Sequence, residues 1–183
     1  KAIGDAFLQK EVFVFAVVNY RNALVIYQRI LGIEHDYTTS LLTSIGDAAR
    51  GIGLNTDQVN EYRKAVSESV AVEKAAEKLI NDDAEIEAIA AYRKAVRKEG
   101  SLIGDYHVST ADLHWKIAKV LKSMERYDSA LVSYRYMLAI NLRSLGTDHM
   151  NTEHAHDDLV DVAILKGLKK EDAISYGQDA KLS

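Results

Sequence analysis

The stretch Tyr62-Arg63-Lys64-Ala65-Val66 returns unchanged as Tyr92-Arg93-Lys94-Ala95-Val96, and this repetition decides the fold class. Two close relatives are Tyr20-Arg21-Asn22-Ala23-Leu24 and Tyr134-Arg135-Tyr136-Met137-Leu138. With Tyr176, the tyrosines fall at positions 20, 62, 92, 134 and 176, so the successive spacings are 42, 30, 42 and 42 residues. A self-similar sequence with a period of this length is typical of helical-repeat proteins.

A second motif keeps the same register. The segments Leu31–His35, Ile103–His107 and Leu145–His149 each contain an apolar residue, then a glycine, and end in histidine. They are 72 and 42 residues apart, and 72 is one 42-residue period plus the short 30-residue one. We therefore expect one repeat domain over 1-183, with units at about 1-34, 35-68, 69-100, 107-144 and 149-183. The chain starts at Lys1 instead of a methionine, which we interpret as an excerpt of a longer protein.

Each unit is predicted to be a pair of helices. Alanine stands four residues before the tyrosine at Ala16, Ala88 and Ala130, and this spacing places both residues on one helical face. Sixteen residues before the tyrosine the sequence usually has a very small residue, such as Gly4 or Gly46, where two helices can approach closely.

The turn between the two helices also has a fixed position. Gly53 and Gly167 occupy it in two units, and a left-handed residue there would end the first helix. Glu11, Asp83 and Glu125 replace the glycine in the other units.

The third unit is short because it lacks the linker between units. We expect the second helix of unit two to end in a turn at Ser67–Ser69. The alternative is one long helix from about Thr56 to Ile80, since no glycine or proline interrupts this segment.

The repeated histidines His35, His107 and His149 are expected to stabilise the linker. The acidic residue before them, Glu34 or Asp148, is expected to cap or orient the next helix.

Two of these patterns resemble a known family. The segment Ile117-Ala118-x2-Leu121 followed by Ala130-x3-Tyr134 is similar to the tetratricopeptide signature, although His114 stands at the signature tryptophan position and the chain has no proline. The 42-residue period and the linker resemble the kinesin-light-chain type of this repeat. The resemblance implies an all-α, right-handed superhelical solenoid of about five helical hairpins, with an inner wall built from the first helix of each unit.

The resemblance also implies which side chains face the concave groove and bind a partner. They are Ser40, Thr43, Asp47, Arg50, Glu73, Glu77, Asp112, Trp115, Lys119, Lys122, His154, Asp157 and Asp161. Trp115 is expected to be the main apolar anchor, because a large rigid side chain gains much on desolvation. Two alternatives stay open: Trp115 packs in the core, or these residues form ordinary solvated helix faces.

Composition excludes several classes of function. The net charge is −4 and the sequence has no block of lysine and arginine, so we expect no nucleic-acid partner. No run of about 18 apolar residues occurs, which predicts a soluble chain without membrane insertion. The absence of cysteine favours a reducing intracellular compartment, cytoplasmic or organellar.

Signals for catalysis are weak. His154, His156, Asp157 and Asp158 could supply two ligands to a metal, but two ligands do not make a site. The motifs of phosphate-binding loops and serine nucleophiles are missing. We expect no enzyme activity, no cofactor and no metal.

The predicted function is an interaction scaffold or adaptor that belongs to a larger complex and binds a protein or peptide in its groove. The alternative is a structural linker subunit that uses its convex face and ends. A metal-dependent enzyme is the third, most distant possibility.

Overall fold

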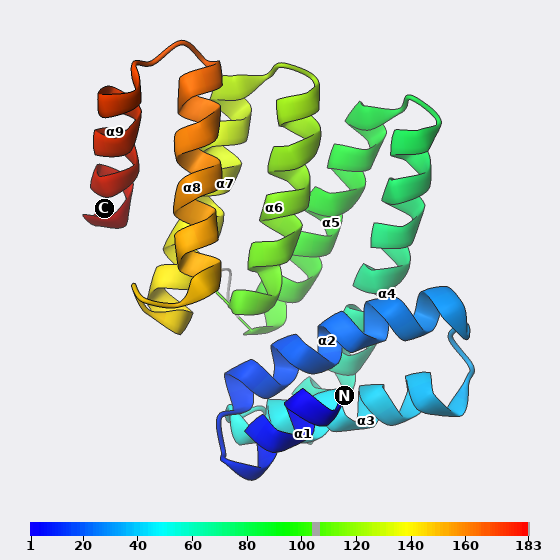
Figure 1. Ribbon diagram of the computed structural model, residues 1–183. Coiled ribbons are helices and arrows are strands. Elements are labelled where there is room, and N and C mark those ends of the chain that lie inside the picture. The colour runs from blue at the N-terminus through cyan, green and yellow to red at the C-terminus, as the bar shows by residue number, and fades with distance from the viewer. Residues whose placement is uncertain (104–106, 183) are drawn as a thin grey trace.

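A computed structural model describes residues 1–103 and 107–182. Over these residues the chain is all-α, as predicted, with nine helices and no strand (Figure 1). The helices are α1 (Ala2–Gln9), α2 (Phe13–Ile30), α3 (Asp36–Gly51), α4 (Thr56–Asn81), α5 (Glu85–Ile103), α6 (Val108–Ser123), α7 (Tyr127–Leu145), α8 (Met150–Leu165) and α9 (Lys170–Leu182). None of these helices is both long and apolar enough to cross a membrane.

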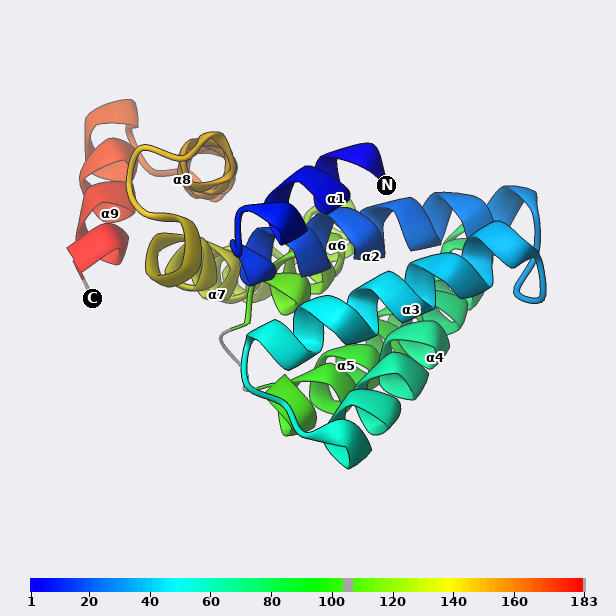
Figure 2. The same ribbon diagram turned by 90° about the horizontal axis from the view of Figure 1, so that it is seen from below.

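Consecutive helices pack against each other, as in a helical repeat. The second half of α4 and the helices α5 to α9 stand side by side in a row. Figure 2 shows α1, α2 and α3 lying together across one end of this row. From that position α2 contacts α4 and α6 as well as its sequence neighbours α1 and α3.

The predicted turn position is left-handed in all five units. Gly53 and Gly167 have φ of 97° and 109°, and Glu11, Asp83 and Glu125 have φ of 59°, 57° and 57°. Three non-glycine residues therefore accept a backbone conformation that L-amino acids usually avoid.

The repeated tyrosines and small residues form the helix joints. Tyr20, Tyr62, Tyr92 and Tyr134 are at most 2% exposed, whereas Tyr176 in the last unit is half-buried. Gly4 lies so close to the Tyr20 ring that a Cβ atom at Gly4 would be 2.6 Å from it. The predicted close approach of helices at Gly4 is confirmed.

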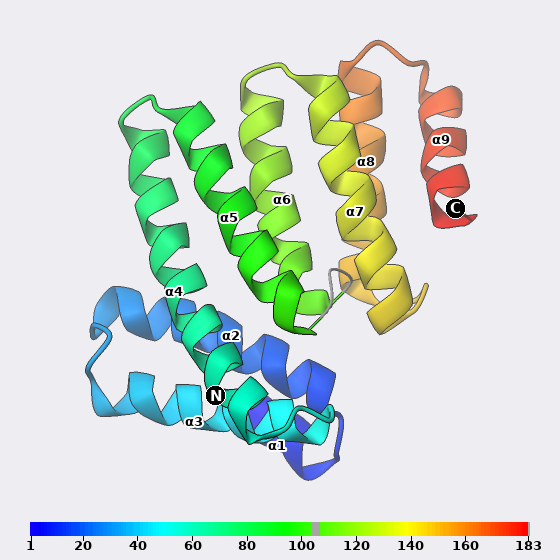
Figure 3. The ribbon, with the colours of Figure 1, turned by 180° about the vertical axis from the view of Figure 1, so that it is seen from behind.

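The expected turn at Ser67–Ser69 is wrong, because α4 continues through it as one helix (Figure 3). A capping box between Asn55 and Gln58 starts this helix. Two serines in the middle of α4 accept hydrogen bonds from α2. Gln28 Nε2 donates to Ser67 Oγ at 3.4 Å, and Arg21 Nη2 donates to Ser69 Oγ at 3.3 Å. The serines thus bond to a neighbouring helix instead of forming a local turn.

The linker motif caps the following helix through its histidine. Nδ1 of His35 accepts a hydrogen bond from the Tyr37 amide at 3.2 Å, and Nδ1 of His149 accepts one from the Asn151 amide at 3.1 Å. The expected acidic cap at Glu34 or Asp148 is therefore wrong, because the side chain of the next residue already satisfies the helix start. In the third copy of the motif, 104–106 lie outside the described residues.

Two hydrophobic clusters form the core. The first joins α2, α3 and the first part of α4, and includes Leu41 and Tyr62. The second runs from the end of α4 to α9, and includes Tyr134 and Leu159. Val18 of α2 packs against the second cluster, so α2 contacts both.

Candidate functional site

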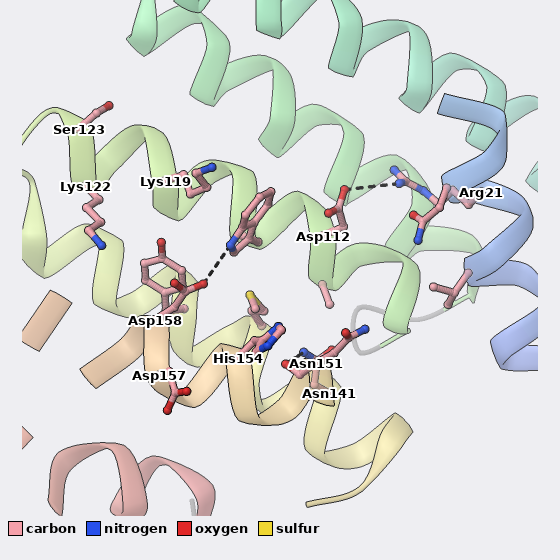
Figure 4. A pocket seen from close by; sticks show the side chains of 16 residues that line it. Arg21, Asp112, Lys119, Lys122, Ser123, Asn141, Asn151, His154, Asp157 and Asp158 are labelled. Carbon is pink, nitrogen blue, oxygen red and sulfur yellow. Dashed lines mark hydrogen bonds and ion pairs between the residues drawn. The ribbon is translucent and has the colours of Figure 1, made fainter. Parts of the chain in front are cut away.

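A groove of about 890 Å³ lies among α2, α6, α7 and α8 (Figure 4). Its walls combine apolar, amide and charged side chains from all four helices. They are Val18, Arg21, Asn22, Ala111, Asp112, Trp115, Lys119, Lys122, Ser123, Tyr134, Met137, Asn141, Asn151, His154, Asp157 and Asp158. We call this site the α2–α8 groove.

Trp115 lies in the wall of the groove in a fixed orientation. Its Nε1 donates a hydrogen bond to Asp158 Oδ2 at 3.0 Å, which ties α6 to α8. The ammonium nitrogen of Lys119 lies 4.3 Å from the centroid of the Trp115 ring, a cation–π contact. The side chain is half-buried and also packs against the second hydrophobic cluster. Trp115 therefore belongs partly to the core and partly to the groove.

The charges in the groove are separated along α6. Lys119 and Lys122 stand near the C-terminal end of this helix, and Asp112 stands near its N-terminal end, facing Arg21 (Figure 4). The Asp112 side chain is 41% exposed and lies 3.9 Å from Arg21 Nη1. A ligand in the groove would thus meet the ammonium groups of Lys119 and Lys122 at one end, where Asp158 also lies, and the carboxylate of Asp112 at the other.

Beneath the Asp112 end is a buried cluster of charges. Arg21, 1% exposed, pairs with Glu73 of α4 and with Glu99 of α5 at 3.0 Å. Lys116 of α6 pairs with Glu73 and lies 3.4 Å from Asp112. Burial alone lowers the pKa of Arg21, but Glu99, Glu73 and Asp112 together raise it above its ordinary value. The guanidinium is therefore a permanent buried cation.

The structure brings together six of the predicted groove residues. Those that line the α2–α8 groove are Asp112, Trp115, Lys119, Lys122, His154 and Asp157. The exposed Asp161 does not line it, and Glu77 pairs with Arg29 of α2 outside it.

The predicted residues of the second unit do not reach the groove. Ser40, Thr43, Asp47 and Arg50 lie on α3, which contributes no lining residue. The wall expected to run through units two to five is therefore interrupted. The physical reason is the uninterrupted α4, which places α3 and α2 across the end of the row.

Glu73 is a further correction, because it is 1% exposed and so does not face an open groove. Glu73 and Glu77 both meet arginines of α2, and repeat spacing could not show that α2 covers this side of α4. Arg21 follows the repeated tyrosine just as Arg63, Arg93 and Arg135 do. Nothing in the sequence distinguishes the one arginine that becomes buried.

Sequence reasoning also missed the lining residues of α2 and α7. Val18 and Asn22 come from a helix that the repeat pattern assigns to the outer layer, and so do Met137 and Asn141. Asn141 is 3% exposed, and its Nδ2 donates to the Asn151 carbonyl at 3.0 Å. A buried asparagine in an otherwise apolar stretch of α7 is the signal that could have indicated this position.

The histidine cluster has no geometry for a metal site. Nδ1 of His156 lies 3.4 Å from Asp157 Oδ1, a contact between neighbours in sequence. Within the part of the chain that the structure describes, no three His, Cys, Asp or Glu side chains are placed to hold one ion. The side chains of the groove offer stacking, hydrogen bonds and charge, which suit binding of an extended polar and apolar ligand.

A comparison with protein-family models gives no match, and a sequence comparison with curated proteins gives none either. The groove and its chemistry therefore carry the functional conclusion.

Proposed function

We propose that this chain is an interaction scaffold of the tetratricopeptide type that binds a peptide segment of a partner protein in the α2–α8 groove. The observation that carries the proposal is Trp115, a half-buried aromatic residue in the wall of a groove of about 890 Å³. Ligand pockets usually fall in the range of about 300 to 1,000 Å³, with a few polar groups among apolar ones. The repeated left-handed turn and the buried tyrosines support the solenoid, for which we propose a right-handed superhelix.

The groove suggests the chemistry of the peptide. A bulky apolar side chain would pack between Trp115 and Met137. An acidic side chain would lie near Lys119 and Lys122, because the same end of the groove presents both ammonium groups. We therefore expect an acidic residue next to a bulky apolar one in the partner.

Trp115 is the only tryptophan of the chain, so its fluorescence reports directly on the groove. Peptides selected from a random display library would be titrated into the protein, with Trp115 emission and calorimetry as the two readouts. Trp115→Ala should weaken binding, measured by calorimetry, by about 2 kcal/mol or more. The matched control is Tyr37→Ala, an aromatic residue of α3 that is 63% exposed and outside the groove.

The two lysines provide an independent measurement. Lys119→Glu combined with Lys122→Glu should mainly slow association, and the effect should shrink at high salt because exposed charges are screened. Equal association rates for the wild type and the double variant would contradict the predicted acidic residue in the peptide.

The structural-linker function has one observation in its favour. Ile26, Ile30, Ile33 and Tyr37 are 53%, 71%, 53% and 63% exposed and lie at the end of the molecule where α2 passes into α3. An exposed apolar group of this kind is typical of an interface. If Tyr37→Ala impairs assembly with a partner and Trp115→Ala does not, this end of the molecule replaces the groove as the working surface.

A further inference from the structure

Helix α2 connects the two halves of the molecule. Its Tyr20 and Leu24 are buried in the first hydrophobic cluster, together with α3 and the first part of α4. Its Val18 packs against the second cluster, and the Phe15 ring lies 5.7 Å from the His149 ring at the start of α8. The apolar side chains of α2 that pack against the second cluster, Val14 and Val18, lie in the N-terminal half of this helix.

The buried polar contacts between α2 and the helices α4 and α5 are made mainly by Arg21. Its Nε and Nη2 donate to Glu99 Oε1 at 3.2 and 3.0 Å, and Nη2 also donates to Glu73 and to Ser69. Glu73 has a second cation in Lys116, but Arg21 is the one cation that pairs with the fully buried Glu99 among the described residues. Glu99 therefore depends on α2 for its neutralisation.

Arg21 also acts on the segment of α4 where the sequence favours a turn. Ser69 and Ser67 lie at the middle of this helix, and both accept hydrogen bonds from α2. Serine side chains in a helix interior can bond to the local backbone and weaken the helix. Here α2 donates hydrogen bonds to them instead, which supports α4 as one uninterrupted helix.

We propose that Arg21 is an electrostatic latch that holds α2 against the second half of α4, α5 and α6. When the latch is lost, α4 bends at Ser67–Ser69 and α2 moves away from the row. Because α2 supplies Val18, Arg21 and Asn22 to the α2–α8 groove, this opening removes one wall of the groove. The latch would thereby set the shape of the groove, but its existence does not rest on the proposed peptide binding.

Arg21 and Arg29 both pair α2 with neighbouring helices, and their different burial explains why only Arg21 should act as the latch. A buried carboxylate without its cation is strongly destabilising, and movement of α2 away from the row would return Glu99 to solvent. The pair between Arg29 and Glu77 also joins α2 to α4, but its side chains are 56% and 36% exposed. Water can replace either partner of that pair, so it should hold the halves together only weakly.

The chain has no cysteine, so two introduced cysteines can carry spin labels without side reactions. We place them at the exposed positions Tyr37 of α3 and Ile164 of α8, and measure the distance between the labels by pulsed electron paramagnetic resonance. Arg21→Met should shift the distance distribution to longer and broader values while the helical circular dichroism is retained. Arg29→Met, the matched control, should keep the distribution of the parent protein.

The double variant Arg21→Met with Glu99→Met separates charge from packing. It removes the orphaned carboxylate and replaces the pair by apolar side chains, so it should return the distribution towards that of the parent. If it stays open, lost packing and not the unpaired Glu99 opens the joint, and the latch is wrong. An unchanged distribution for Arg21→Met overturns it directly.

A milder variant covers the case in which Arg21→Met does not fold. Arg21→Gln keeps a hydrogen-bond donor that can reach Glu99, but removes the positive charge that neutralises this buried carboxylate. The latch predicts a partial shift to longer distances for this variant. An Arg21→Gln protein with the distance distribution of the parent would overturn the proposal.

Discussion

At the scale of single residues, the turn between the two helices of each unit places one residue in the left-handed conformation. Glu125 and Asp83 adopt φ of 57° at the position where Gly167 has 109°. The left-handed conformation costs a non-glycine residue roughly 1 to 2 kcal/mol, whereas glycine adopts it freely. The units without glycine therefore carry a local strain that stacking between neighbouring hairpins must offset.

This strain can be measured by replacing the residue at the left-handed turn position, with glycine in one unit and with alanine in another. Glu125 is exposed, so Glu125→Gly should stabilise the protein by about 0.5 to 1 kcal/mol, the strain relieved less the added entropy of the unfolded chain. Gly167→Ala should destabilise it by about 1 kcal/mol, because alanine meets the same strain. Urea unfolding followed by circular dichroism measures both; a loss of stability in Glu125→Gly would contradict the assignment of strain.

His107 predicts a dependence of stability on pH. Burial lowers the pKa of His107 to about 4, below the ordinary value of about 6.5 expected in the unfolded chain. The unfolded state therefore binds a proton more readily, so the stabilising contribution is present above pH 6.5 and is lost as the pH falls from 6.5 to 4. Between pH 7 and pH 5 the wild type should lose about 1 to 2 kcal/mol more than His107→Gln. Urea unfolding at the two pH values measures this difference. If the wild type and His107→Gln lose the same free energy of unfolding, His107 does not cause the pH dependence.

At the scale of the elements, the joints between helices decide whether a substitution helps or harms. Alanine is a better helix former than glycine by about 1 kcal/mol, so propensity alone favours Gly4→Ala in α1. The Tyr20 ring opposes it, since it lies 2.6 Å from the position of the new Cβ atom and is itself buried. Packing should win, because the ring has no room to move.

We therefore expect Gly4→Ala to destabilise the contact of α1 with α2 by about 1 to 3 kcal/mol. The comparison is Gly46→Ala at the equivalent position of the second unit, where the nearest atom is Cδ of the flexible Arg63 at 2.8 Å. That side chain can shift, but Cγ1 of the buried Val59 also lies 3.2 Å from the new Cβ atom, so Gly46→Ala should destabilise the protein less than Gly4→Ala does. Amide hydrogen exchange measures both effects, and higher protection of α1 in Gly4→Ala would contradict the packing argument.

The sequence predicts elements well where the contacts repeat. Tyr62 and Tyr92 are buried, and the turn falls at the same position in every unit, because these contacts form within or between neighbouring hairpins and recur with the period. The path of α4 could not be predicted in this way. The residue that holds it, Arg21, is 48 residues from Ser69, and its repeat equivalents give no sign of such a contact. The groove residues Val18, Arg21 and Asn22 were missed for the same reason, since α2 enters the groove through this one long-range arrangement.

At the scale of the whole molecule, stability is divided between two hydrophobic clusters. Leu41 and Leu159 are both fully buried, one in each cluster. Repeat proteins are stabilised mainly by contacts between neighbouring units, so damage to one end need not spread to the other. The two halves are linked by α4, by the Arg21 contacts, by Val14 and Val18 of α2 and by Leu102 of α5.

The single tryptophan makes this division measurable. Trp115 packs against the second cluster, so its fluorescence follows that half, whereas circular dichroism follows all the helices. Leu41→Ala and Leu159→Ala should each cost about 2 to 5 kcal/mol in their own cluster. Leu159→Ala should lower the midpoint of both signals in urea. Leu41→Ala should lower the midpoint of the dichroism and leave that of the fluorescence closer to the wild type, because the half that contains Trp115 keeps its own core. If Leu41→Ala moves both midpoints equally, the two clusters unfold as one cooperative unit, and the links through α4 and Arg21 are strong enough to join them.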